Sequence, residues 1–270
     1  MIKLGFMQGR LVPPEQNKIQ SFPWKNWDKE FKIANDIKLN LMEWTIDKEN
    51  FHQNPINNTL GIKKIKKLTK KFNIKINSIT CDFFMQSPFF KKKNYQTLNE
   101  LKYLITNCGK LNIKYIVLPL VDGGAIKNQN YERIFISQIK KLQKNLEKNK
   151  VKLIFESDFK PKKLLKFINK LPSKNFGINY DLGNSAGLDI SFEEEKIYFH
   201  RVYNIHLKDK NKKNISVDLG NGVGNFKDLF EYCKKINYKG NYILQTARNK
   251  NDIGIIKKNI KFIKKFYDKN

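Results

Sequence analysis

The sequence predicts an α/β protein of the (β/α)8 TIM-barrel class, formed as a single domain over residues 1–270. Two observations lead to this prediction. Strand-like and helix-like segments alternate from one end of the chain to the other, which is typical of a parallel sheet with helices between its strands. Eight strand-like segments can be counted in a chain of 270 residues, and a closed barrel of this class typically needs roughly 250 residues.

The first half of the chain supplies four predicted strands, each a short run rich in Ile, Leu, Val and aromatic residues. These strands are residues 2–7, 38–44, 74–84 and 113–120. Each is followed by a segment in which apolar residues recur with helical spacing. These helices are residues 27–37, 60–73, 94–112 and 131–149. The loop of residues 8–26 carries three prolines, and we expect it to fold over one rim of the barrel.

The second half of the chain supplies the other four predicted strands and a last helix at residues 252–267. The strands are VKLIFES (151–157), NFGINYD (175–181), VYNIHLKD (202–209) and GNYILQTAR (240–248). A doubly wound open sheet is the alternative fold. Such a sheet more often has a Gly-rich turn after its first strand, and GFMQGRLVPP does not match the GxGxxG pattern of that turn. The closed barrel is therefore the preferred prediction.

The chain is strongly basic, with a formal net charge of +28, and only four of its 53 basic residues are arginines. In the predicted helix 60–73, lysines fill the positions between Ile62, Ile65 and Leu68, which share one apolar face. We interpret the lysines as solvated helix faces and predict no specific nucleic-acid partner. A polyanion-binding role is the alternative that the charge leaves open.

The rest of the composition bears on the cellular setting. Three cysteines, an odd number and widely spaced, do not form a disulfide framework and fit a reducing cytoplasm. No apolar stretch is long enough to span a membrane, and the N-terminal segment lacks the cleavage site of a secretory signal. These features predict a cytoplasmic protein with no membrane partner. They leave open whether the chain forms a homodimer.

Each of the last four predicted strands carries, at or near its end, a residue that can bind a metal or a polar substrate. These residues are Glu156, Asp181, His206 and Gln245. The first three are spaced 25 residues apart, and the fourth follows after 39. All strands of such a barrel end at one rim, where active sites are built. The pattern therefore predicts one shared site. The alternative is that each polar residue simply ends its strand where the chain meets water.

The ordered set of Glu156, Asp181 and His206, together with NIHLKD and the closing TAR, resembles the xylose-isomerase-like TIM-barrel superfamily. That group includes sugar and sugar-phosphate isomerases and epimerases, inosose dehydratases and DNA repair enzymes of the endonuclease IV type. The segments GFMQGRLVPP, NYDLGNSA and ILQTAR are most similar to bacterial chains described as sugar phosphate isomerase/epimerase or hexulose-6-phosphate isomerase-like.

The resemblance implies a metal site. In epimerases of this group the metal is held by a Glu, an Asp, a His and a Glu at strands five to eight. By position these ligands are Glu156, Asp181, His206 and Gln245. One divalent ion is implied, either Mn, Co, Zn or Mg. The two glutamates usually also act as the acid/base pair, but Gln245 cannot take a proton. The resemblance therefore implies Glu156 as the catalytic base, which suits a one-base isomerisation or a β-elimination better than a symmetric epimerisation.

Several other residues are candidates for binding the substrate. Arg10 and Arg248 follow strands one and eight, which become neighbours when the barrel closes, so their planar forks could share a phosphate or carboxylate. Lys208 follows the metal-ligand position and could point into the site. Glu43, taken as ending the second strand, could contact hydroxyls or serve as a second acid/base, as could Asp82 after the third. The alternative for each is a structural contact within the chain.

Two neighbouring features could also take part. The loop at residues 219–226 has glycines at every second position, and its backbone amides could hold an anion. A tight turn would explain the same pattern. Asp209, next to Lys208, is expected to orient a neighbouring residue.

The leading functional prediction is a metal-dependent isomerase or epimerase acting on a small-molecule sugar or sugar phosphate. A dehydratase that uses the same metal site is the second reading. A non-catalytic sugar-binding barrel, in which Gln245 marks lost catalysis, is the third. A DNA repair nuclease is least favoured, because it needs a multi-zinc site rich in histidine and the chain has 3 histidines in all.

Overall fold

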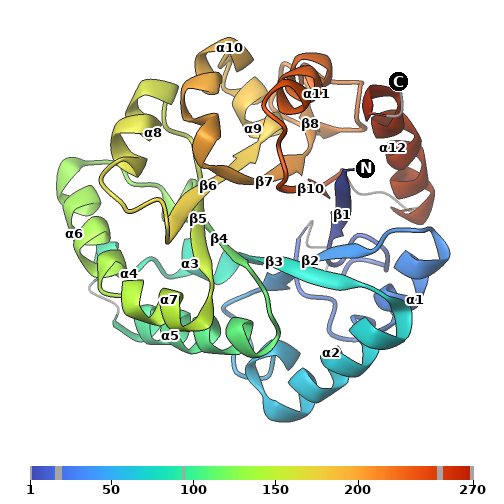
Figure 1. Cartoon of the computed structure of the whole chain (residues 1–270), viewed down its shortest axis with the longest axis horizontal. Helices are drawn as coiled ribbons and strands as arrows, with labels where there is room; N and C mark the ends of the chain where they lie inside the picture. The colour runs from blue at the N-terminus through green and yellow to red at the C-terminus, as the bar shows by residue number, and fades with distance from the viewer. Residues whose placement is uncertain (1, 16–19, 93–94, 248–251, 268–270) are drawn as a thin grey trace.

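Eight parallel strands form a closed barrel with helices around it in the computed structural model, which describes residues 2–15, 20–92, 95–247 and 252–267 (Figure 1). The order around the barrel is β1, β2, β3, β4, β5, β6, β7 and β10, and β10 pairs with β1 to close it. This confirms the predicted fold class. The strands are β1 (Lys3–Met7), β2 (Leu41–Ile46), β3 (Lys75–Cys81), β4 (Tyr115–Leu120), β5 (Lys152–Ser157), β6 (Phe176–Asp181), β7 (Val202–Leu207) and β10 (Asn241–Leu244).

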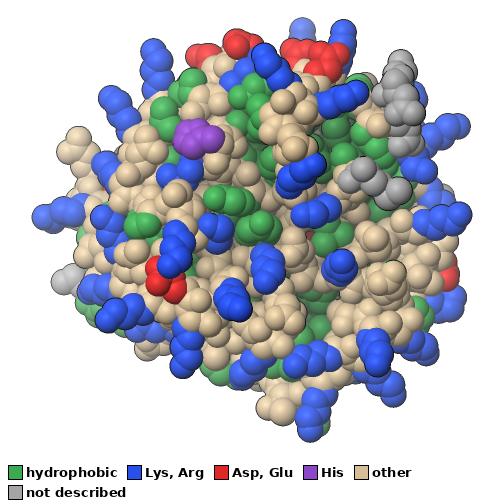
Figure 2. Space-filling view, viewed as in Figure 1, with side chains coloured by type: hydrophobic (Ala, Val, Ile, Leu, Met, Phe, Trp, Pro, Cys, Tyr) green, Lys and Arg blue, Asp and Glu red, His purple; other side chains and the backbone are tan. Residues whose placement is uncertain are grey.

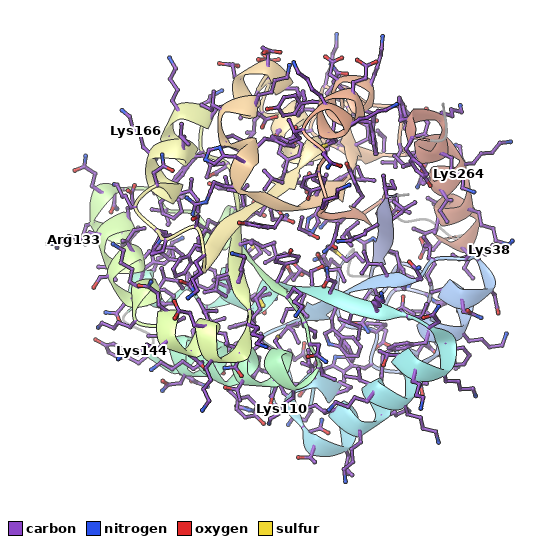
Figure 3. The ribbon with its side chains drawn as sticks, in the orientation of Figure 1. Lys38, Lys110, Arg133, Lys144, Lys166 and Lys264 are labelled. Atoms are coloured by element: carbon purple, nitrogen blue, oxygen red, sulfur yellow. The ribbon has the colours of Figure 1, made fainter. Side chains whose placement is uncertain are left out.

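Helices surround the barrel and turn their lysine-rich faces outward (Figures 1 and 3). The longer ones are α1 (Lys29–Asp36), α2 (Thr59–Phe72), α5 (Tyr95–Lys110), α6 (Gln129–Lys140), α7 (Gln143–Asn149), α8 (Pro161–Ile168), α11 (Phe226–Lys235) and α12 (Asp252–Tyr267). The short ones are η1 (Pro55–Asn57), α3 (Asp82–Gln86), α4 (Phe89–Lys92), η2 (Asp122–Gly124), α9 (Leu182–Gly187), α10 (Phe192–Glu195) and η3 (Lys196–Arg201). None of the helices in the described part of the chain is long and apolar enough to cross a membrane.

The surface agrees with the interpretation of the lysines as solvated residues. Lys144, Lys166 and Lys264 point away from the barrel in Figure 3. Basic side chains are scattered over the face shown in Figure 2 and do not gather into a single stripe.

The apolar core lies between the strands and the surrounding helices. Phe135 of α6 is fully buried and contacts Phe155 of β5 edge-on, with ring centroids 5.5 Å apart. Phe89 stacks on Phe135 at 5.7 Å, and Phe167 of α8 lies 5.9 Å from it. Each such aromatic side chain removes a large apolar area from water, so this layer holds the helices against the barrel.

Some of the predicted elements differ from the observed ones. The predicted helix 131–149 is divided into α6 and α7. The predicted strand 74–84 ends at Cys81, and the next residues form α3; a continuous apolar run does not distinguish a buried strand from a buried helix. The predicted strand 38–44 is shifted, because Thr45 and Ile46 still pair with β3. Glu43 therefore lies within β2 and not at its end.

A small hairpin follows β7, and the loop of alternating glycines comes after the second strand of this hairpin. Its strands are β8 (Asp209–Lys210) and β9 (Ser216–Val217). The Asp209 carboxylate accepts hydrogen bonds from the backbone amides of Gly220, Gly222 and Gly224 at 2.9, 2.9 and 3.0 Å. The anion held by these amides is thus a side chain of the protein itself. This contact positions the residues on either side of Asp209, among them Lys208.

Candidate active site

Strands β5, β6 and β7 are consecutive neighbours in the barrel and bring three predicted ligands together. The ligand atoms of Glu156, Asp181 and His206 all lie within 4.8 Å of one another, and all three side chains are buried. His206 Nδ1 is 3.2 Å from Glu156 Oε2 and 3.9 Å from Asp181 Oδ2. Two carboxylates and an imidazole form a donor set that suits a divalent transition metal or Mg.

Two buried oxygens at this site could serve as ligands of a cation. Asp181 Oδ2 and Gln245 Oε1 have no hydrogen-bond partner among the described residues. A buried polar atom without a partner costs free energy, so such atoms usually have a function that explains them. A cation bound next to Glu156 and His206 would satisfy Asp181 Oδ2, and Gln245 borders the same cavity. The residues present therefore fit the metal that the sequence pattern implies.

Glu43 lies beneath His206 and fixes the orientation of its ring. His206 Nε2 is 2.7 Å from Glu43 Oε1, and an ionised carboxylate only accepts hydrogen bonds, so Nε2 carries a proton and Nδ1 faces the other ligands. Glu43 also accepts hydrogen bonds from Ser78 Oγ at 2.6 Å and Asn204 Nδ2 at 2.9 Å. It is fully buried, which corrects the expectation that it contacts a substrate. Metal-binding histidines commonly have such a partner.

Three asparagines that the sequence reasoning missed complete the site. Asn184 Nδ2 and Asn179 Nδ2 donate to the two oxygens of Glu156 at 2.7 and 3.0 Å. Asn204 Nδ2 donates to Asn179 Oδ1 at 2.7 Å. A signal for two of them was present in the sequence. Asn179 and Asn204 lie two residues before Asp181 and His206, and strand alternation places such residues on the same face.

A cavity of about 440 Å³ opens at this rim. Glu156 borders it from β5 and Gln245 from the position just after β10, and Asp82, Gln20 and Lys208 border it from the loops and α3. Its volume falls in the range of small-molecule sites, roughly 300–1,000 Å³. Its polar lining suits a ligand rich in hydroxyl groups.

Lys208 points into the site, as expected from the sequence. Its Nζ is 3.3 Å from Asn184 Oδ1 and 3.8 Å from Asp181 Oδ2. Arg10 does not border the cavity. It is 3% exposed, its Nε donates to the Thr246 carbonyl at 3.1 Å, and its Nη2 lies 3.4 Å from Gln20 Oε1. This favours the structural alternative for Arg10. Arg248 lies outside the described residues, so its role in substrate binding stays a prediction.

The model of the family described as "Xylose isomerase-like TIM barrel" matches residues 31–266 of the chain. The chain belongs to this family. Comparison with curated protein sequences gave no significant match. The solved structures with similar folds are distant in sequence, and those below are 16% identical or less, so they support the fold alone.

Three structures illustrate the similarity of this xylose isomerase-like barrel to known proteins. The 3-keto-D-glucoside 4-epimerase YcjR from E. coli has a TM-score of 0.72 and 13% identity, with coverage of 98% of this chain and 100% of that one. The IOLI protein with a bound zinc atom has a TM-score of 0.76 and 16% identity over 98% and 99%. The D-psicose 3-epimerase from Clostridium cellulolyticum H10, solved with D-tagatose, has a TM-score of 0.75 and 10% identity over 98% and 99%.

The three ligand residues of this xylose isomerase-like site differ in how their surroundings shift their pKa values. Burial alone would lower the pKa of His206, but the Glu43 carboxylate and then Glu156 together raise that pKa to about 10. Burial would raise the pKa of Glu156, yet the hydrogen bond and charge of His206, with help from Lys208, lower it. Burial raises the pKa of Asp181, and the Lys208 charge only partly opposes this. Without metal, the site therefore stores a proton on His206.

We predict that metal binding at pH 8 releases about one proton. The pKa of His206 near 10 means that the metal-free ring is protonated at that pH, and a metal can bind Nδ1 only after this proton leaves. Metal affinity should therefore rise with pH. Titration calorimetry with Mn²⁺ in buffers of different ionisation enthalpy measures the released protons. Binding without proton release would mean that Nδ1 is not a ligand.

The contact between Glu43 and His206 generates a second prediction. Glu43→Gln removes the charge that orients the ring, so metal affinity should fall by about 10–100-fold, the usual cost of losing such a partner. Glu195→Gln is the matched control, because Glu195 is also a buried carboxylate but binds the hydroxyls of Tyr180 and Tyr198. Equal Mn²⁺ affinity of the Glu43 variant and the wild type would contradict the assigned role.

Proposed function

We propose that this protein is a divalent-metal-dependent isomerase or epimerase of small sugars in which Glu156 is the catalytic base. The proposal rests on the convergence of Glu156, Asp181 and His206 at the edge of a polar cavity, where Asp181 Oδ2 and Gln245 Oε1 are buried without a hydrogen bond. Membership of the xylose isomerase-like family supports it. So do the epimerases among proteins of similar fold.

The metal would be held by Glu156, Asp181 and His206, with the side-chain carbonyl of Gln245 as a further ligand. A divalent ion bound there would polarise the carbonyl group of the sugar. The zinc atom in the IOLI protein supports the presence of a metal at such a site. Because Glu156 and Asp181 are the only charged oxygen ligands in this set, we expect weaker metal binding than in a site with three carboxylates.

Glu156 would take a proton from the carbon next to the sugar carbonyl. Its oxygens accept hydrogen bonds from Asn184 and Asn179, which hold the carboxylate in one orientation. In the metal-free site His206 lowers the pKa of Glu156, and in the metal-loaded site the charge of a divalent ion would likewise favour the ionised carboxylate that a base requires. Both effects prepare the carboxylate before the substrate binds.

Gln245 would position the substrate or the metal without moving a proton. Its Nε2 donates to Gln20 Oε1 at 3.0 Å, which leaves Oε1 as the atom available to a ligand. A glutamine in this place favours chemistry with a single base among the metal ligands. A dehydratase would use the same residues, and a sugar-binding barrel would use them without turnover, so product analysis distinguishes the three functions.

The substrate is proposed to be a free sugar. The glycine-loop amides that could hold a phosphate already bind Asp209, and Arg10 already donates to Thr246 and Gln20. Lys208 already contacts Asn184 and Asp181. These predicted anion-binding groups are thus engaged within the chain.

We predict a higher kcat/KM for free ketohexoses than for their 6-phosphates, measured with the Mn²⁺-loaded protein. The glycine-loop amides, Arg10 and Lys208 already have partners within the chain, so fewer hydrogen-bond donors remain to bind a phosphate. A clear preference for the phosphates would contradict this. It would assign an anion site to Lys210, which also borders the cavity, or to Arg248.

Variants at the two ends of the ligand set test the role of the base. Glu156→Ala should abolish turnover, a loss of at least about 10²–10⁴-fold, and should weaken metal binding, because it removes both the base and a charged ligand. Gln245→Ala should lose less of both, because it removes a neutral ligand. Kinetics and elemental analysis of both variants measure these effects.

Gln245→Glu provides the complementary variant, because the added charge should tighten metal binding. The base assignment would be overturned by a Gln245→Ala variant that keeps its metal and is as inactive as Glu156→Ala. In that case Gln245 would orient the substrate or a catalytic water.

A further inference from the structure

Inverting a carbon next to a carbonyl requires two proton transfers. One group removes a proton from one face, and another group returns a proton to the other face. Glu156 supplies the first group in the proposed function, but Gln245 has no proton that titrates. The second group must therefore come from elsewhere in the cavity wall. Besides Glu156, the carboxylates that border the cavity among the described residues are Asp47, Asp82, Asp122 and Asp158.

Three of these four carboxylates are poorly suited to proton transfer at a shielded carbon. Asp47 accepts a hydrogen bond from the Phe22 backbone amide at 2.7 Å, so it holds the loop before α1. Asp122 and Asp158 are exposed residues, where a carboxylate keeps full hydration. Asp82 differs from them, because it is 7% exposed and still borders the cavity.

The surroundings of Asp82 connect it to the metal-ligand positions. It is the first residue of α3, directly after β3, and its Oδ2 accepts a hydrogen bond from Gln20 Nε2 at 2.7 Å. Gln20 Oε1 in turn accepts from Gln245 Nε2 at 3.0 Å, and Arg10 Nη2 lies 3.4 Å from the same oxygen. The hydrogen bond seen for the Asp82 side chain among the described residues is the one from Gln20, and it goes to Oδ2 and not to Oδ1. One oxygen is thus fixed in place and the other is left for a ligand.

We propose that Asp82 is the second proton-transfer residue of this site, acting with Glu156 to epimerise a free ketose at the carbon next to its carbonyl. This inference rests on the proposed function and narrows it to epimerisation. The aspartate after β3 takes over the proton that a carboxylate at the position of Gln245 would otherwise carry.

The Glu156 carboxylate takes the proton, and the electrons of the broken C–H bond form a C=C bond while the carbonyl oxygen gains the negative charge. The Asp82 carboxylic acid then gives its proton to the same carbon from the opposite face. The C=C electrons form the new C–H bond, and the carbonyl is restored. Glu156 is left protonated and Asp82 ionised, and proton exchange with water returns both to their starting states.

The charges around Asp82 are compatible with both of its states. Burial raises the pKa of Asp82 most, and the charges of Asp47 and Glu156 raise it further. The hydrogen bond from Gln20 and the charge of Arg10 lower it. The resulting pKa of Asp82 is about 7. A group with a pKa near the working pH can both give and take a proton. Since the forward step needs Asp82 protonated, turnover should fall as the pH rises through about 7.

The test compares Mn²⁺-loaded wild type, Asp82→Asn and Glu195→Gln in D2O, with D-fructose and D-tagatose as probes. Nuclear magnetic resonance follows deuterium entering the substrate and the appearance of the epimer. Asp82→Asn should still exchange the substrate proton, because Glu156 is intact, but epimer formation should fall by about 10²–10⁴-fold. Glu195→Gln also removes the charge of a buried carboxylate, but Glu195 binds the hydroxyls of Tyr180 and Tyr198 and does not border the cavity, so this variant should behave like the wild type. The fall in activity above pH 7 should be absent from the residual activity of Asp82→Asn.

Each of the other outcomes overturns either the role of Asp82 alone or the proposed function as well. Epimer formation by Asp82→Asn at the wild-type rate overturns the role of Asp82 and leaves the proposed function intact. Isomerisation of the sugars by the wild type without inversion of a carbon also overturns the role of Asp82 and leaves the proposed function intact. Loss of both exchange and epimer formation in a folded, metal-loaded Asp82→Asn protein also overturns that role, because Asp82 would then serve binding. A wild type that neither exchanges nor converts either sugar overturns the proposed function itself, and the role of Asp82 with it.

Discussion

The hydrogen bond between Glu43 and His206 is the contact on which the arrangement of the site depends. Both side chains are completely buried, and a buried charge without a partner is strongly unfavourable. Glu43 therefore needs the ring, Ser78 and Asn204, and these contacts decide which nitrogen of His206 faces Glu156. From Asn204 the network continues through Asn179 to Glu156 itself. The base and the metal ligands thus share one set of supports inside the barrel.

That network extends through the barrel interior toward its opposite end. Asn204 Oδ1 accepts from Asn241 Nδ2 at 3.0 Å, and Asn241 Oδ1 accepts from Asn77 Nδ2 at 2.8 Å. Strands β3, β7 and β10 are therefore joined by side chains as well as by the closure of the sheet. Amide side chains suit this task, because each offers both a donor and an acceptor and carries no charge to be compensated. A satisfied polar network of this kind makes the interior specific to one arrangement.

The sequence predicted the barrel and the convergence of Glu156, Asp181 and His206, because both depend on local pattern. Strands β5 to β7 carry Glu156, Asp181 and His206 at or next to their ends, so residue type and spacing were sufficient. The sequence did not predict the place of Glu43, because pairing with β3 extends β2 by two residues beyond the predicted end. It left the roles of Arg10 and Asp209 open, because their partners come from segments that fold beside them and no local pattern names such partners. Gln20 was missed for the same reason.

The hydrogen bonds of the Asp209 carboxylate have a consequence for how tightly a sugar can bind. Three glycines would leave their loop with many backbone conformations, and ordering such a loop at each binding event would cost entropy. Asp209 instead restricts the loop permanently through three amides, so the chain loses this freedom when it folds and not when it meets a ligand. The rim beside Lys208 is therefore preorganised, and a greater share of the contact energy with a small, flexible sugar remains as affinity.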